Sequence, residues 1–153
     1  MTLQAFDRSG RADFRVELVR QAWESVGNGD YGRLSDLLAN DVVWVIPSMP
    51  NVPFAGTWRG RDQVQKFFRL VEATQEVIEF TPCEVIAQGD QVVVLGNFAN
   101  RVKATGKISR SQWAQVWTIR DGQIASMLEF VDTNAVSSAF RPKGDGSFIS
   151  GAK

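Results

Sequence analysis

The second half of the sequence is a series of apolar, β-branched runs separated by short turn signals, and this pattern restricts the possible folds most. The runs cover residues 77–88, 91–104, 107–120 and 123–133, and the separating dipeptides are Gly89-Asp90, Thr105-Gly106 and Asp121-Gly122. Such dipeptides are typical of tight hairpin turns, so the four runs predict a four-stranded antiparallel meander. Pro82 lacks a backbone donor, which predicts an edge position, a bulge or a break in the first run.

The first half of the sequence has helical periodicity instead. Val64, Phe67, Phe68 and Val71 recur at helical spacing and predict a helix over 61–74. Three more helices are predicted: one over 14–26 with Asp13 as its cap, a short one after Asp30, and a short one over 134–140. A strand is predicted over 42–46 and is ended by Pro47. The remaining segments are predicted as an arm over 1–12, a loop over 47–60 and a loose tail from 141. Because helices come first and the meander last, the order indicates an α+β fold. One face of the meander would pack on the helices, and the other would be available to a dimer partner.

Length and charge restrict the class of protein further. The chain has 153 residues, which is typical of a single domain, and its 17 basic and 17 acidic residues leave no basic excess for nucleic acid. No apolar run approaches the roughly 18 residues that a membrane span needs, and residues 1–13 lack the apolar segment of a signal peptide. Cys83 is the only cysteine, which is typical of a protein of the reducing cytoplasm. These features predict a cytoplasmic protein without a nucleic-acid or membrane partner.

The sequence contains no histidine. This excludes Ser-His and Cys-His nucleophilic catalysis and every histidine-ligated metal site. Any chemistry must therefore use carboxylates, Tyr, Lys, Arg, hydroxyl groups or the single thiol. No Gly-rich phosphate loop and no cluster of metal ligands occurs, so neither a cofactor nor a metal is predicted.

Four short motifs, taken in order, carry a resemblance to a known family. They are Asn28-Gly29-Asp30, the run Ala55 to Arg61, the run Gly89 to Val93, and Asp121 to Ile124 followed by Glu129 to Thr133. Their order and spacing resemble those of SnoaL-like proteins in the NTF2-like superfamily, over about residues 14–140. The resemblance implies one SnoaL-like domain over 1–153: a cone-shaped α+β fold with N-terminal helices packed on a curved antiparallel (mixed) sheet, and a homodimer.

The resemblance also allows known chemistries of the superfamily to be compared with this chain. Ketosteroid isomerases use an Asp base, a Tyr and a protonated Asp, and these roles fall near Ile46, Ala22 and Gln115 here. None of the three residues can replace the original group in proton transfer. Classical steroid isomerisation is therefore not expected.

Two other chemistries of the superfamily depend on a last-strand Asp that matches Asp132. Epoxide hydrolases add an Arg and a second Asp, which fall near Asn97 and Ala99, so their triad is incomplete. An inward Arg101 would partly replace the Arg, but the partner carboxylate would still be lacking. SnoaL-type cyclases need only an apolar pocket and one acid/base Asp. Asp132 is therefore the predicted catalytic residue, with its pKa raised by aromatic surroundings or held down by Arg101.

Strand alternation supplies the remaining predicted site residues. If Asp132 points inward, Phe130 does too, and Glu129 points toward the dimer face. The predicted substrate-binding set is Trp44, Ile46, Trp58, Asn97, Arg101, Trp113, Gln115, Trp117 and Phe130. Structural alternatives stay open: Asp132 as a helix cap, the tryptophans as core or dimer packing, and Arg101 on a solvated face.

Together these observations predict a protein that binds a small hydrophobic molecule in an apolar pocket, with acid/base chemistry of the isomerase, cyclase or hydrolase type at Asp132. The alternative is a non-catalytic ligand-binding or dimeric assembly module of the same superfamily. An inward, desolvated Asp132 would favour the enzyme, and a pocket filled by its own side chains would favour the module.

Overall fold

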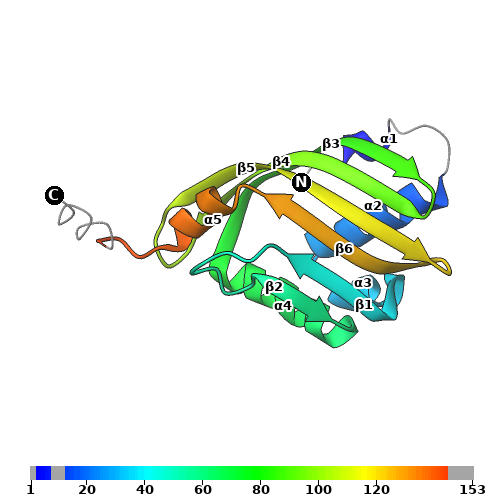
Figure 1. Cartoon of the computed structure of the whole chain (residues 1–153), viewed down its shortest axis with the longest axis horizontal. Helices are drawn as coiled ribbons and strands as arrows, with labels where there is room; N and C mark the ends of the chain where they lie inside the picture. Colours follow the sequence, from blue (N-terminus) through cyan, green and yellow to red (C-terminus); the bar gives the residue numbers. More distant parts are fainter. Residues whose placement is uncertain (1–2, 8–12, 145–153) are drawn as a thin grey trace.

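A curved, unclosed six-stranded sheet with helices against one face forms the framework of the computed structural model, which describes residues 3–7 and 13–144 (Figure 1). The strands are β1 (Leu38–Ile46), β2 (Gly56–Arg59), β3 (Gln75–Gln88), β4 (Gln91–Val102), β5 (Ile108–Arg120) and β6 (Gln123–Val131). The helices are α1 (Gln4–Asp7), α2 (Phe14–Gly27), α3 (Tyr31–Leu37), α4 (Arg61–Thr74) and α5 (Thr133–Phe140). The predicted α+β class is confirmed.

The strand order in the sheet is β2-β1-β6-β5-β4-β3, and β1 and β6 form its parallel pair. Strands β3 to β6 form the predicted antiparallel meander. Its last hairpin turns at Asp121 (φ 52°) and Gly122 (φ 74°), where both residues have the left-handed conformation that matches the twist of the flanking strands. The local turn signals therefore determined which strands became neighbours.

Strand β3 lies at the edge of the sheet, with β4 as its partner. Pro82 pairs with Gly96, and the register shifts between Pro82 and Glu84. Both the edge position and the bulge expected from this proline are confirmed. Because proline has no N–H to donate, an edge strand is where it disturbs the sheet least.

The helix ends follow local capping chemistry. A side-chain oxygen of Asp13 accepts from the backbone N–H of Arg15 at 3.0 Å and begins α2, and Asp30 accepts from the backbone N–H of Arg33 at 3.0 Å and begins α3. Helix α4 has the bounds that its periodicity predicted. These caps explain why the starts of the helices could be predicted from the sequence.

Strands β1 and β2 differ from the sequence prediction. Strand β2, within a segment predicted as a loop, pairs antiparallel with β1, so that Trp58 lies opposite Trp44. Strand β1 begins at Leu38, earlier than the predicted Val42. Both differences arise from pairing with distant strands, which β-propensity within a short window does not record. A short helix, α1, also lies in the segment predicted as an arm, while the tail from 145 onward lies outside the described residues.

Candidate functional site

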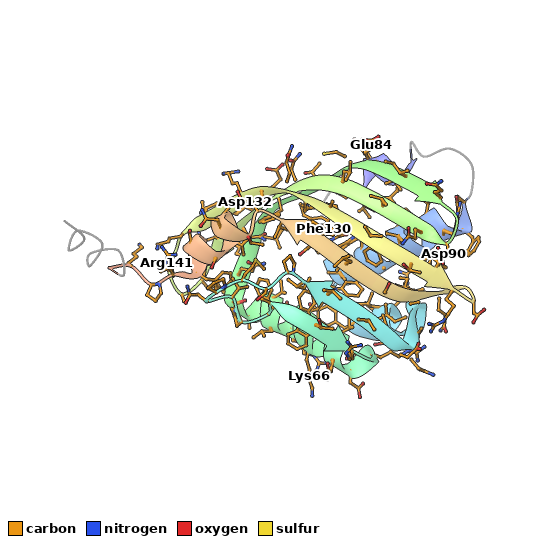
Figure 2. All side chains as sticks on the ribbon, viewed as in Figure 1. Lys66, Glu84, Asp90, Phe130, Asp132 and Arg141 are labelled. Carbon is orange, nitrogen blue, oxygen red and sulfur yellow. The ribbon has the colours of Figure 1, made fainter. Side chains whose placement is uncertain are left out.

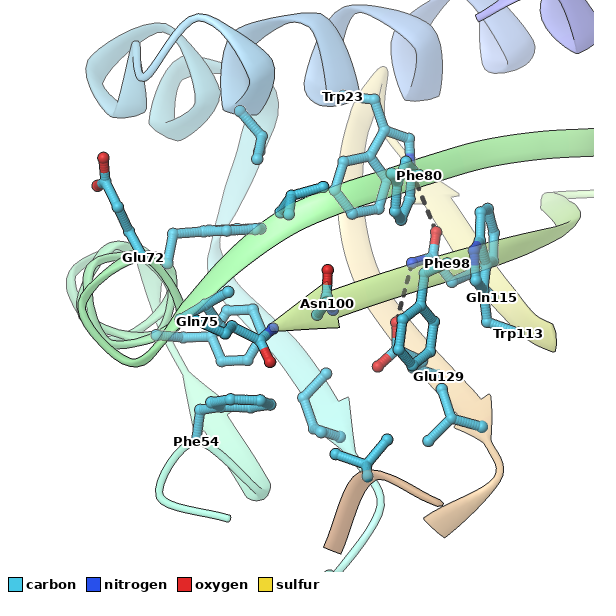
Figure 3. Close-up of a pocket in the computed structure, with 18 of the residues that line it drawn as sticks. Trp23, Phe54, Glu72, Gln75, Phe80, Phe98, Asn100, Trp113, Gln115 and Glu129 are labelled. Atoms are coloured by element: carbon cyan, nitrogen blue, oxygen red, sulfur yellow. Dashed lines mark hydrogen bonds between the residues drawn. The ribbon is translucent and has the colours of Figure 1, made fainter. Parts of the chain in front are cut away.

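A cavity of about 590 Å³ lies between the sheet and the helices (Figure 3). Its volume is in the range of pockets that hold small organic molecules. Aromatic side chains make up much of the wall: Trp23, Tyr31, Trp44, Phe54, Phe67, Phe68, Phe80, Phe98 and Trp113. Several contact one another, as in the stacked pair Phe80–Trp113, whose ring centroids are 4.8 Å apart. The wall of the cavity is therefore largely aromatic.

Strand β6 presents Met127, Glu129 and Val131 to the cavity. Leu128 and Phe130 point the other way and are 38% and 54% exposed (Figure 2). The structure therefore corrects the prediction that Phe130 lines the pocket and that Glu129 points toward the dimer face.

A β-bulge explains why the faces are reversed. Near the turn, Ile119 pairs with Ile124, but farther along Thr118 pairs with Ser126, so Ala125 is an extra residue on β6. A regular hairpin would place Leu128 opposite Gln115, and the bulge places Glu129 there instead. Because opposite residues share a face, this single insertion moves every side chain of β6 beyond the bulge to the other side of the sheet.

Asp132 lies outside the cavity, at the end of β6. Its Oδ1 accepts from the backbone N–H of Ala135 at 3.0 Å, and it is the N-cap of α5. Its side chain is exposed. The strand ends at Val131, so strand alternation no longer applies at this residue. The structure thus corrects the expectation of an inward Asp132 and supports the alternative of a helix cap.

Among the described residues, three carboxyl groups line the cavity: Glu72 and Glu76, which are exposed, and Glu129, which strand β6 holds in the wall. The Oε1 atom of Glu129 accepts a hydrogen bond from Gln115 Nε2 at 3.1 Å. Gln115 Oε1 in turn accepts from the indole N–H groups of Trp23 and Trp117, each at 3.2 Å (Figure 3). Because two indoles can only donate, they hold the Gln115 amide with its NH₂ group toward Glu129.

The surroundings of Glu129 shift its titration toward neutrality. Burial raises the pKa of Glu129 to about 7, and the hydrogen bond from Gln115 lowers it in part. Among the described residues that line the cavity, the cationic side chain is Lys103, whose Nζ donates to the backbone carbonyl of Glu72 at 2.8 Å. A carboxyl group with a pKa near 7 can both accept and release a proton at physiological pH.

Four of the predicted binding residues line the cavity, namely Trp44, Ile46, Trp113 and Gln115. Trp117 is buried behind them and acts on the site through Gln115. Trp58 is half-buried outside the cavity, where its indole N–H donates to the Phe54 carbonyl at 3.0 Å. Trp58 therefore supports the cavity wall through Phe54.

Strand β4 contributes different residues from those predicted. Asn97 is exposed and donates to Cys83 Sγ at 3.3 Å, and Arg101 is exposed and forms an ion pair with Glu76 at 3.2 Å. Neither lines the cavity, and Phe98 and Asn100 do so in their place. Val92 and Val94 are fully buried, and Phe98 and Asn100 continue their even-numbered alternation along the strand.

Two further findings about the described residues concern membrane-spanning helices and metal-binding clusters. No helix in residues 3–7 and 13–144 is long and apolar enough to cross a membrane. In the same part of the chain, no three His, Cys, Asp or Glu side chains come together as a group that could hold a metal ion.

Fold and cavity together define an α+β protein of the NTF2-like type with an apolar pocket. Residues 19–127 match the family model described as "SnoaL-like domain", and the chain belongs to this family. An NTF2-like protein from Burkholderia xenovorans LB400 is 30% identical, with a TM-score of 0.80, over 86% of this chain and 98% of that one. TerC, co-crystallised with polyporic acid, is 25% identical, with a TM-score of 0.74, over 84% and 98% of the two chains. An uncharacterized protein of Mycobacterium tuberculosis is 24% identical over 84% of this chain and 96% of its own length.

Proposed function

We propose that this protein binds a small hydrophobic molecule in the aromatic cavity and that Glu129 acts there as the acid/base group. The chemistry would be of the isomerase, cyclase or hydrolase type first expected at Asp132. The observation that carries the proposal is the carboxyl group of Glu129, with a pKa of about 7, in an apolar wall and held by Gln115. TerC, a relative crystallised with a small organic acid, supports small-molecule binding in this fold.

In this proposal, the two oxygens of Glu129 have separate roles. Oε1 is held by Gln115, whereas Oε2 has no hydrogen-bond partner among the described residues. Oε2 is then the atom that exchanges a proton with a bound ligand. Gln115 cannot itself transfer a proton, so it orients the carboxyl group, and the two indoles orient Gln115. Positioned acid/base groups of this kind contribute about 10²–10⁴-fold to a rate.

A thermal-shift screen followed by a matched pair of variants tests this proposal. Steroids, terpenoids and aromatic polyketide analogues would be screened, since a ligand at about 100 times its Kd adds roughly 2.7 kcal/mol, or about 5–10 °C in Tm. Binders would then be tested for turnover with wild type, Glu129→Gln and Glu84→Gln, the last being an exposed glutamate on β3 (Figure 2). We expect loss of turnover in Glu129→Gln alone. Equal turnover in both variants would refute the role of Glu129, and a panel without binders would refute the pocket.

A second candidate function, dimeric assembly, is favoured by the outer face of the sheet. The strand registers place apolar side chains in two rows across that face: Ile86, Val93, Val116 and Leu128 in one row, and Leu95, Ala114 and Phe130 in the next. Exposed apolar faces of this kind are typical of protein interfaces. We propose that two copies pair through this outer face.

Light scattering coupled to size-exclusion chromatography tests the dimer. Wild type should elute as a dimer and Phe130→Asp as a folded monomer, because a carboxylate would be buried in the apolar interface. Asp132→Asn, an exposed substitution next to the same strand end, serves as the control and should remain dimeric. A wild-type monomer at all concentrations would contradict the assembly.

A further inference from the structure

Two amide side chains on the wall of the cavity have no hydrogen-bond partner. Gln75 is 8% exposed, and its side chain makes no hydrogen bond within the described residues. Asn100 also lines the cavity, and its Oδ1 is buried without any partner there. Buried amide oxygens are almost always paired, so an unpaired one on a ligand cavity points to a missing donor.

These amides lie away from Glu129. Gln75 is the first residue of β3, directly after α4, and Asn100 lies near the end of β4 opposite Val77. The residue opposite Gln115 on β4 is Val94, which precedes Asn100 by six positions (100 − 94). Figure 3 shows Gln75 beside α4, Gln115 and Glu129 on the side away from α4, and Asn100 between them. One ligand could therefore contact both groups only with polar atoms on separate parts of its skeleton.

We infer that Asn100 and Gln75 form a second polar subsite, which binds a hydroxyl group of a planar aromatic or polycyclic ligand whose other end lies at Glu129. The unpaired atom of Asn100 is an acceptor, so the ligand must donate to it, and a hydroxyl group can also accept from a neighbouring amide. Apolar side chains of the wall, including Phe98 and Val77, bind the skeleton between the two ends, and the charged residues Glu72, Glu76 and Lys103 also line the cavity. The inference depends on the proposed function for the end at Glu129.

Matched probes test the subsite by calorimetric titration. The compound 4,4′-dihydroxybiphenyl carries a hydroxyl group at each end, and 4-hydroxy-4′-methylbiphenyl replaces one by a methyl group of similar size. Wild type should bind the dihydroxy compound about tenfold or more tightly, since loss of the donor leaves the amide unpaired. Asn100→Leu should lose or reverse this preference, and Asn97→Leu, on the outer face of the same strand, should retain it.

Thermal unfolding without ligand provides a second measurement. If Asn100 serves a ligand rather than the fold, Asn100→Leu removes an unpaired buried amide, and its Tm should equal or exceed that of wild type. A lower Tm would indicate a structural amide and overturn the inference. Absence of a hydroxyl preference in wild type, its persistence in Asn100→Leu, or no binding of either probe would do the same.

The two proposals fail in distinguishable ways. Glu129→Gln should abolish turnover and leave the hydroxyl preference intact, because the Asn100 contact does not involve the carboxyl group. If turnover depends on Glu129 but the hydroxyl preference is absent, only the second subsite is refuted. If the preference is present and Glu129→Gln changes nothing, only the acid/base role is refuted.

Discussion

Substitution of Glu129 by Gln should change how the stability of the protein depends on pH. Burial raises the pKa of Glu129 from an ordinary value of 4.5 to about 7 in the folded state. Between these values the folded protein holds a proton that the unfolded chain has released, so the contribution to stability is full below pH 4.5 and is lost as pH rises through 7. The loss corresponds to about 3 kcal/mol at 1.36 kcal/mol per pKa unit.

Urea unfolding of wild type and Glu129→Gln from pH 4.5 to 8 measures this effect. The amide of the variant does not titrate, so its stability relative to wild type should rise by about 3 kcal/mol across that range, or roughly 6–12 °C in Tm. A constant offset from altered packing next to Gln115 would not depend on pH. Glu84→Gln, an exposed control, should show no such trend. A difference between wild type and Glu129→Gln that stays flat from pH 5 to 8 would refute the raised pKa.

Three further substitutions test the structural roles of individual residues. Asp132→Ala should lower the free energy of unfolding, measured with urea, by about 1 kcal/mol through loss of the α5 cap. Ligand binding, measured by calorimetry, should stay unchanged, and a loss of binding would contradict the position of Asp132 outside the cavity. Gly96→Ala should destabilise the fold strongly, because the new Cβ would lie 2.3 Å from the Trp113 ring, and normal expression with an unchanged Tm would disprove that contact. Trp117→Phe removes one of the two donors to Gln115 and should cost about 1 kcal/mol on unfolding, whereas a neutral result would show that the second indole suffices.

Much of the architecture could be predicted because its signals are local. Asp13 and Asp30 cap the helices they precede, and the Asp121-Gly122 turn joins the strands on either side of it. Helix α4 follows from the spacing of its apolar residues. Each signal acts within a few residues of the chain, where steric and hydrogen-bonding preferences are strong.

The candidate site could be predicted only in part. Trp44, Trp113 and Gln115 were expected in the pocket and line it, because they belong to strands with a regular alternation. Asn100 was missed, although the alternation that starts at Val92 extends to it. The prediction instead followed Asn97, whose odd-numbered position lies on the opposite face.

The sequence by itself determined the class of fold, the order of its long helices and of the meander strands, and the restriction of any chemistry to side chains other than histidine. Only the tertiary structure decided that Glu129, and not Asp132, faces the cavity. One extra residue, Ala125, brings Glu129 opposite Gln115, and the end of β6 leaves Asp132 as a cap. The physical reason is that side chains alternate with a period of two, so one inserted residue reverses the faces of a strand, and whether it is inserted depends on pairing with another strand.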